Sequence, residues 1–194
     1  MTRTFPVSAF LIAAGLAAAE TAWAHPGHGS GGFAGGLIHP LTGADHLWTM
    51  VAVGLWAAQR GGKTFWWLPA TFLSALLAGT FLAYAAPGFA LFESGIAASL
   101  LLLGLVIMIP ARLPTSLCLG FGAALGVLHG YAHGVELAPH SHLLSFAAGM
   151  LVATAGLHLA GMVSGVLWRR HLGLLSAVLG GATALFGSFL LLQG

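Results

Sequence analysis

Long apolar runs follow one another along almost the whole chain, separated by short segments that contain glycine, proline or basic residues. The runs lie near residues 38–58, 65–85, 92–109, 115–136, 143–167 and 172–192. Each run has about the 20 residues that an α-helix needs to cross a bilayer, and the residues between the runs favour turns. The pattern predicts an all-α integral membrane protein in which residues 38–194 form a six-helix transmembrane bundle.

Residues 1–24 have the pattern of a secretory signal peptide. Arg3 precedes an apolar stretch that ends in the cleavage sequence Ala-Trp-Ala. Cleavage there would start the mature chain at His25, in a glycine-rich tail over residues 25–37 that also carries His28. Such a tail is expected to be flexible. The alternative is an uncleaved first membrane helix, for which the apolar stretch is short.

The composition agrees with a bilayer as the solvent. Hydrophobic residues make up 58% of the 194 residues and charged residues 5%, and the mean hydropathy is +0.96; a soluble domain is far more polar. Six basic and four acidic side chains are too few for a nucleic-acid-binding surface. The single cysteine, Cys118, has no CxxC partner, which argues against a disulfide, a redox pair or a thiolate metal site. A metal ion would have to be bound by carboxylates and by some of the ten histidines.

The basic residues predict how the spans are oriented. After the signal peptide they follow the first, third and fifth predicted spans, at Arg60, Lys63, Arg112, Arg169 and Arg170. These loops share one side of the membrane, which the positive-inside rule makes cytoplasmic. The signal peptide independently places the mature N-terminus on the other side. We expect a multi-pass protein of the bacterial inner membrane with a periplasmic N-terminus.

The first predicted span carries a group of polar residues at its periplasmic end. Pro40 can occupy the first helical turn, and His39 and His46 are seven residues apart, which places them on one helix face. Asp45 could bind a metal ion directly, or accept the ring N–H of a histidine and so select its tautomer. A carboxylate in a membrane helix is costly without a partner, so a functional role is expected; capping of nearby backbone is the alternative. Met50 could add a soft sulfur ligand, although methionine more often fills a core.

The fourth predicted span carries a second group, His129, His133 and Glu136. Spacings of four and three residues place both imidazoles and the carboxylate on one stripe of a helix, from which they can bind one ion. Imidazole suits nickel, zinc, copper and iron alike, so the ligand type does not select the metal.

A stripe of glycines runs along the same span, at Gly122, Gly126, Gly130 and Gly134. Small residues at intervals of four allow the backbone of another helix to approach closely. The stripe is a packing feature, and it predicts that the fourth span is central in the bundle.

Several other side chains are weaker metal-binding candidates. Glu93 lies near the start of the third span, where it could be a ligand or a counter-ion. His140 and His142 lie in the loop between the fourth and fifth spans, and His25 and His28 in the N-terminal tail. His158 lies deeper in the fifth span, where it could form an inner station.

The chain resembles the HupE/UreJ family of nickel permeases. The resemblance is carried by His39-Pro-Leu-Thr-Gly-Ala-Asp45-His46, Glu93-Ser-Gly-Ile-Ala, His129-Gly-Tyr-Ala-His133-Gly-Val-Glu136 and Thr154-Ala-Gly-Leu-His158. It implies a secondary, ATP-independent permease for Ni²⁺, or in some members Co²⁺, with no enzymatic activity and no catalytic cofactor. It also implies that the metal ligands include His39, Asp45, His46, His129, His133 and Glu136.

Transport is therefore the main functional prediction, with the lipid bilayer and a divalent metal ion as partners. The tail and loop histidines would gather the ion, and the two helical groups would bind it after partial dehydration. Two rival functions use the same residues: an intramembrane zinc-dependent hydrolase, which lacks an accompanying nucleophile or oxyanion motif, and a metal sensor or chaperone without a conduction path. Zn²⁺ is an alternative ion, and a homo-oligomer is compatible with the sequence.

Overall fold

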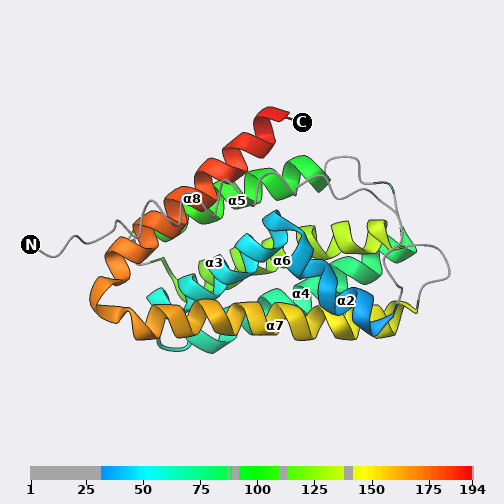
Figure 1. Cartoon of the computed structure of the whole chain (residues 1–194), viewed down its shortest axis with the longest axis horizontal. Coiled ribbons are helices and arrows are strands. Elements are labelled where there is room, and N and C mark those ends of the chain that lie inside the picture. The colour runs from blue at the N-terminus through cyan, green and yellow to red at the C-terminus, as the bar shows by residue number, and fades with distance from the viewer. Residues whose placement is uncertain (1–31, 87, 89–91, 110–112, 138–141, 194) are drawn as a thin grey trace, which may run out of the picture.

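The fold is built from helices alone in the part of the chain that the structure describes. A computed structural model describes residues 32–86, 88, 92–109, 113–137 and 142–193, in which it contains seven α-helices, one 3-10 helix and no strand (Figure 1). The helices are α2 (Phe33–Thr42), α3 (Ala44–Arg60), α4 (Thr64–Ala85), α5 (Phe92–Met108), α6 (Thr115–Glu136), α7 (Leu143–Leu167), η1 (Arg169–His171) and α8 (Leu172–Gln193). The predicted signal peptide and the tail histidines His25 and His28 lie outside the described residues.

Five of the predicted spans coincide with one helix each, to within one residue at either end. Among the described residues, four helices are long and apolar enough to cross a membrane: Thr64–Ala85, Thr115–Glu136, Leu143–Leu167 and Arg169–Gln193. The apolar helix α5 is shorter, with 17 residues. The described residues are thus all-helical, with several helices of the length and apolar composition of a multi-pass membrane protein.

The first predicted span is two helices rather than one. Helix α2 begins at Phe33, inside the predicted flexible tail, and the chain is extended at Gly43 (φ −85°, ψ 115°) before α3 begins. The Thr42 hydroxyl donates a hydrogen bond to the His39 carbonyl oxygen over 3.0 Å, which replaces part of the interrupted helical ladder. Asp45 then lies in the first turn of α3, where the positive end of the helix dipole favours a carboxylate.

The expectation for Pro40 is therefore wrong. Pro40 lies near the C-terminal end of α2 and not in the first turn of a helix. At that position it removes a backbone N–H that would bond four residues back, and the helix ends two residues later, at Thr42. His39 and His46 consequently belong to different helices.

The glycine stripe of α6 lies against the backbone of another helix, as predicted, and that helix is α4. A Cβ on any of the four glycines would lie 1.9–2.5 Å from an atom of α4, closer than any carbon can approach. Their nearest neighbours in α4 are Leu68, Phe72, Leu76 and Thr80, each 54 positions earlier in the chain. Because this offset is constant, α4 and α6 run in the same direction in close backbone contact.

Helix α7 packs against α2 and α3 through glycines in the same way. A Cβ at Gly36 would lie 1.9 Å from the Phe146 carbonyl oxygen, and one at Gly149 would lie 2.0 Å from the Phe33 carbonyl oxygen. From α2 into α3 the paired residue numbers rise together, from Gly36 with Phe146 through Gly54 with His158 to Ala58 with Gly165, so α7 runs parallel to α2 and α3. Helices α5 and α8 form a separate antiparallel pair, which lies along the upper edge of the bundle in Figure 1.

The contacts of α4 with α6 have counterparts between α7 and α3. A Cβ at Gly79 of α4 would lie 2.3 Å from the Val127 carbonyl oxygen of α6. A Cβ at Gly161 of α7 would lie 2.1 Å from the Val51 carbonyl oxygen of α3. The two contacts are related by constant differences in residue number. Gly161 of α7 is 82 positions after Gly79 of α4, and Val51 of α3 is 76 positions before Val127 of α6.

A second pair of contacts obeys the same two shifts. A Cβ at Gly130 of α6 would lie 1.9 Å from the Leu76 carbonyl oxygen of α4. A Cβ at Gly54 of α3 would lie 2.1 Å from the His158 carbonyl oxygen of α7. The differences, 158 − 76 and 130 − 54, are again 82 and 76. Leu76 and His158 are therefore equivalent positions.

The contacts between α5 and α8 show the same kind of relation within a single pair of helices, with a difference of 83 residues. Gly104 lies against Ala184, and Gly187 lies against Leu101, so that 187 − 104 and 184 − 101 are both 83. Helices α3, α4 and α5 thus form one repeat, and helices α6, α7 and α8 form a second repeat in which each helix corresponds in order to one of the first. Since α4 reverses the direction of α3 and runs parallel to α6, the repeats have opposite orientations, as in many secondary transporters.

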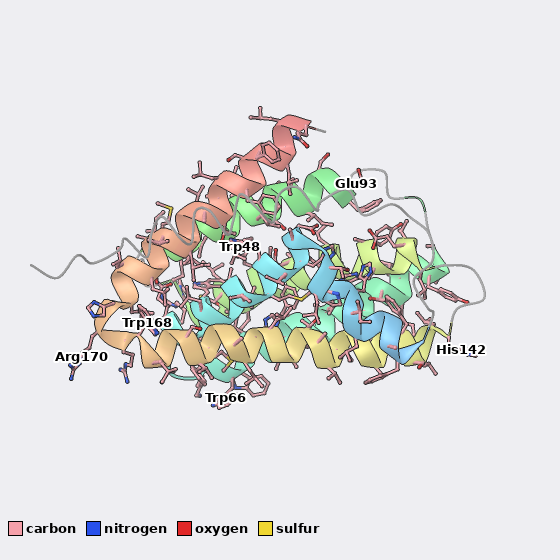
Figure 2. The ribbon with its side chains drawn as sticks, viewed as in Figure 1. Trp48, Trp66, Glu93, His142, Trp168 and Arg170 are labelled. Carbon is pink, nitrogen blue, oxygen red and sulfur yellow. The ribbon has the colours of Figure 1, made fainter. Side chains whose placement is uncertain are left out.

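The two ends of the bundle carry different residues. Figure 2 shows Trp168 and Arg170 at one end and His142 at the other, with Glu93 at the start of α5. A guanidinium nitrogen of Arg60 donates a hydrogen bond to the Leu113 carbonyl oxygen, which ties the α3–α4 turn to the segment before α6. Arg112 lies outside the described residues.

Candidate metal site

Helices α2, α3 and α6 bring four imidazoles together at one end of the bundle. The ring centroids are 4.7 Å apart for His39 and His133, 4.4 Å for His46 and His133, 5.4 Å for His46 and His129, and 5.9 Å for His39 and His46. We call these four residues the four-histidine cluster. The two groups that the sequence singled out therefore form one constellation, although they are about 90 residues apart in the chain.

The spacing of the rings suits a metal ion. An imidazole nitrogen binds zinc at about 2.0–2.1 Å, so two rings bound to one ion have centroids about 4.5–5.3 Å apart. His133 lies 4.4 Å and 4.7 Å from its two neighbours, close to this range. The separations of His46 from His129 and of His39 from His46, 5.4 Å and 5.9 Å, are longer than this range, so these rings would have to move closer together to bind the same ion.

Asp45 selects the tautomer of His46. The Asp45 Oδ1 atom lies 2.9 Å from His46 Nδ1, and a carboxylate oxygen can only accept this hydrogen bond. The Nδ1 atom of His46 therefore carries a proton, and in the neutral imidazole this leaves a lone pair on Nε2. That nitrogen is buried and has no partner among the described residues. A carboxylate that holds a histidine in this way also makes it a stronger metal ligand.

His129 has the same arrangement, with a backbone acceptor. Its Nδ1 donates a hydrogen bond to the Leu125 carbonyl oxygen over 2.9 Å. Its Nε2 is buried and without a partner in the part of the chain that the structure describes, and the same holds for both ring nitrogens of His133. A buried polar atom without a partner costs about 1–3 kcal/mol. Four such nitrogens in one cluster indicate that a ligand completes the site.

His39 and Glu136 form the outer edge of this site. The His39 Nε2 atom lies 2.9 Å from Glu136 Oε2, and ligand atoms of His39, His133 and Glu136 all lie within 4.8 Å of one another. The side chains of Glu136 and His39 are 48% and 31% exposed, whereas His129 and His133 are fully buried. An ion would therefore meet an exposed carboxylate first and buried imidazoles afterwards.

The structure places the weaker candidates differently. Met50 is fully buried in the core, one turn after His46. Glu93 is exposed in the first turn of α5 and is not one of the grouped ligand atoms of the described chain (Figure 2). His142 is exposed just before α7, and His158 is buried within α7. His25, His28 and His140 lie outside the described residues.

Two further residues support the site and were not predicted from the sequence. A Cβ at Gly43 would lie 2.9 Å from His46 Nδ1 and 3.1 Å from Asp45 Oδ1, so only glycine leaves this pair undisturbed. The ring of Phe72 is fully buried and lies 6.1 Å from His129. A single glycine or phenylalanine inside an apolar run has no sequence signal that separates it from packing residues, although Gly43 does lie within the polar segment of the first span.

Comparison with known proteins shows similarity to one family over most of the chain. Residues 12–190 match the family model described as HupE / UreJ protein. Protein HupE of Rhizobium leguminosarum bv. viciae is 35% identical over 179 residues, which cover 92% of this chain and 94% of that protein. No solved structure matches the chain.

Proposed function

Because this chain belongs to the HupE/UreJ family, we propose that it is a permease that carries a divalent transition metal ion from the periplasm to the cytoplasm. The observation that carries this proposal is the four-histidine cluster. Its buried ring nitrogens, several of which have no partner among the residues that the structure describes, lie in a bundle of apolar helices, where polar side chains are otherwise costly. No chemical reaction is needed to account for these residues, and we propose no enzymatic activity.

The proposed route begins where the site is exposed. Glu136 and His39 would attract the hydrated ion and replace part of its hydration shell. His133 lies within contact of both His39 and His46, so it would pass the ion to the deeper ligands. Neutral imidazoles bind a divalent ion less tightly than a cage of thiolates, which favours release.

Nickel is the proposed substrate because of the family resemblance described above. Imidazole and carboxylate ligands also accept Co²⁺ and Zn²⁺, so the donor set itself does not select the metal. The ion is cargo in this account, and no catalytic cofactor is proposed.

We propose that α2 and α3 together form the first of six spans, with the mature N-terminus in the periplasm of a bacterium and the protein in the inner membrane. The two helices cover 27 residues between Phe33 and Arg60, apart from Gly43, enough to cross a bilayer even with a break. Arg60 at the end of α3, Lys63 after it, and Arg169 and Arg170 after α7 favour a cytoplasmic position for those turns. The exposed edge of the four-histidine cluster would then face the periplasm.

Replacing Asp45 by asparagine tests the function through the site that we assign to it. Asp45→Asn keeps the size of the side chain but removes the charge that holds the His46 tautomer. Loss of such a supporting carboxylate lowers metal affinity about 10–100-fold. We expect the external Ni²⁺ concentration for half-maximal uptake by expressing cells to rise by the same factor, measured by the nickel content of washed cells.

Arg170→Gln is the matched control, because it removes a charge at the opposite end of the bundle (Figure 2). It should leave the half-maximal concentration unchanged. If Asp45→Asn cells took up nickel with the wild-type concentration dependence, Asp45 would have no role in binding. If wild-type protein added no nickel uptake to the host cells, the proposed function itself would be wrong.

A further inference from the structure

We propose that His158 forms a second, inner metal station, separated from the four-histidine cluster by the ring of Phe72. This inference rests on the proposed function and adds a step to it. The ion would leave the four-histidine cluster, pass the aromatic ring and bind the imidazole of His158 before its release.

The hydrogen bond of His158 leaves one nitrogen free to bind a metal ion. Its Nδ1 donates to the Met50 carbonyl oxygen over 2.7 Å, so the lone pair is on Nε2. That atom is buried and has no partner in the described ranges, and the residue is 1% exposed. His129 has the same arrangement. Buried polar atoms in proteins normally have a hydrogen-bond partner. If His158 only tied α7 to α3, its second nitrogen would be expected to have a partner as well.

Phe72 connects the two stations. Its ring centroid lies 6.1 Å from that of His129 and 4.9 Å from that of His158. The ring is fully buried, and the backbone of Phe72 is fixed by its carbonyl oxygen, which lies against Gly126 of α6. Rotation of one aromatic ring would therefore open or close the path between the two imidazoles.

His158 also lies at the depth expected for the next station. Its partner Met50 is four residues after His46, which corresponds to about 6 Å along α3. The imidazole of His158 is thus bonded to the backbone of α3 one turn further into the bundle than His46. The two stations follow each other along the same helix.

Two buried hydroxyl groups lie along the same stretch of the helices. Thr49 lies three residues after His46 on α3, and Thr154 lies four residues before His158 on α7, so each shares a helix face with its histidine. Both residues are fully buried, and both hydroxyl oxygens lack a partner among the residues described. Hydroxyl oxygens can replace water around a partly dehydrated divalent ion.

Comparison of the two repeats shows that the packing at the position of His158 does not require a histidine. Leu76 occupies the equivalent position in the first repeat, with its carbonyl oxygen against Gly130 as that of His158 lies against Gly54. A hydrocarbon side chain therefore satisfies the packing of this position. The imidazole is present in one repeat only, at the interface between the two repeats, where transporters of this kind bind their substrates.

The test compares purified wild-type protein with His158→Leu and His158→Asn. Leucine is the residue at the equivalent position, and asparagine retains an N–H that can reach the Met50 carbonyl oxygen while it removes the Nε2 ligand. Ni²⁺ binding is measured by equilibrium dialysis, and Ni²⁺ influx is measured in proteoliposomes that contain a metal-sensitive dye. We expect both variants to keep the tightest binding step and to lose influx by about tenfold or more. Wild-type protein should also bind one more Ni²⁺ per chain than either variant.

A normal rate of influx in His158→Asn would overturn the inference, because the hydrogen bond to Met50 would then explain the residue. Equal Ni²⁺ stoichiometry in all three proteins would overturn it as well. If wild-type protein conducted no ion, the proposed function would fail, and the stoichiometry would still decide whether His158 holds an ion of its own.

Discussion

Replacement of His133 by alanine should reduce nickel uptake by about 100-fold or more, to the level of cells without the protein. His133 is the central member of the four-histidine cluster, because its ring lies 4.7 Å from that of His39 and 4.4 Å from that of His46. It is fully buried, and neither ring nitrogen has a partner among the described residues. Its removal would leave the outer and inner ligands without the one that bridges them.

His171→Ala is the matched control for this substitution. His171 lies in the exposed 3-10 helix η1, at the end of the bundle away from the four-histidine cluster. Uptake is measured as cell-associated nickel, normalised to the amount of each protein in the membrane. We expect His171→Ala to match wild type. Substantial uptake by His133→Ala at normal protein levels would mean that the ion does not pass through this cluster.

Replacement of Gly130 by valine should prevent the bundle from forming. A Cβ at this position would lie 1.9 Å from the Leu76 carbonyl oxygen and 2.7 Å from its carbon. These are backbone atoms, so no side-chain rotation can relieve the overlap, and α4 would have to move away from α6. The cost should exceed the roughly 1–3 kcal/mol of ordinary overpacking.

Gly120→Val provides the control on the same helix, because a Cβ at Gly120 meets nothing within 4 Å. The intrinsic cost of valine in a helix is then the same in both variants. We expect Gly120→Val to accumulate in the membrane and to elute as a single species in detergent, and Gly130→Val to be degraded or aggregated. Normal accumulation of Gly130→Val would show that α4 and α6 are not in backbone contact.

Most helix boundaries could be predicted from the sequence, because in a membrane protein the length of an apolar run directly sets the length of a helix. The break at Gly43 could not. The polar segment around it is short and lies between apolar stretches, and a lone glycine is tolerated in a membrane helix. The break depends on packing between segments distant in the chain, since α2 is held against α7 through Gly36 and Gly149.

The residues of the site could be predicted from their type and spacing, but their arrangement could not. His129, His133 and Glu136 share a stripe on any helix, whereas their approach to His46 requires the positions of α3 and α6 in the bundle. The sequence allows Asp45 either to bind the ion directly or to support a histidine, and the structure shows the hydrogen bond of the second arrangement. The equivalence of Leu76 and His158 could not be predicted from the sequence. The two repeats have equivalent contacts between helices, but the residues at the equivalent positions differ.

Transport of Ni²⁺ through the four-histidine cluster is tested most directly by Ni²⁺ influx into proteoliposomes that contain only the purified protein. We expect saturable influx without ATP, which external Co²⁺ and Zn²⁺ inhibit because they bind the same imidazoles. Influx should be faster for Ni²⁺ than for either competitor. His46→Ala protein, reconstituted at the same density, should show only the leak of empty vesicles. Wild-type protein that binds Ni²⁺ but admits none, or His46→Ala protein that admits it at the wild-type rate, would contradict the account.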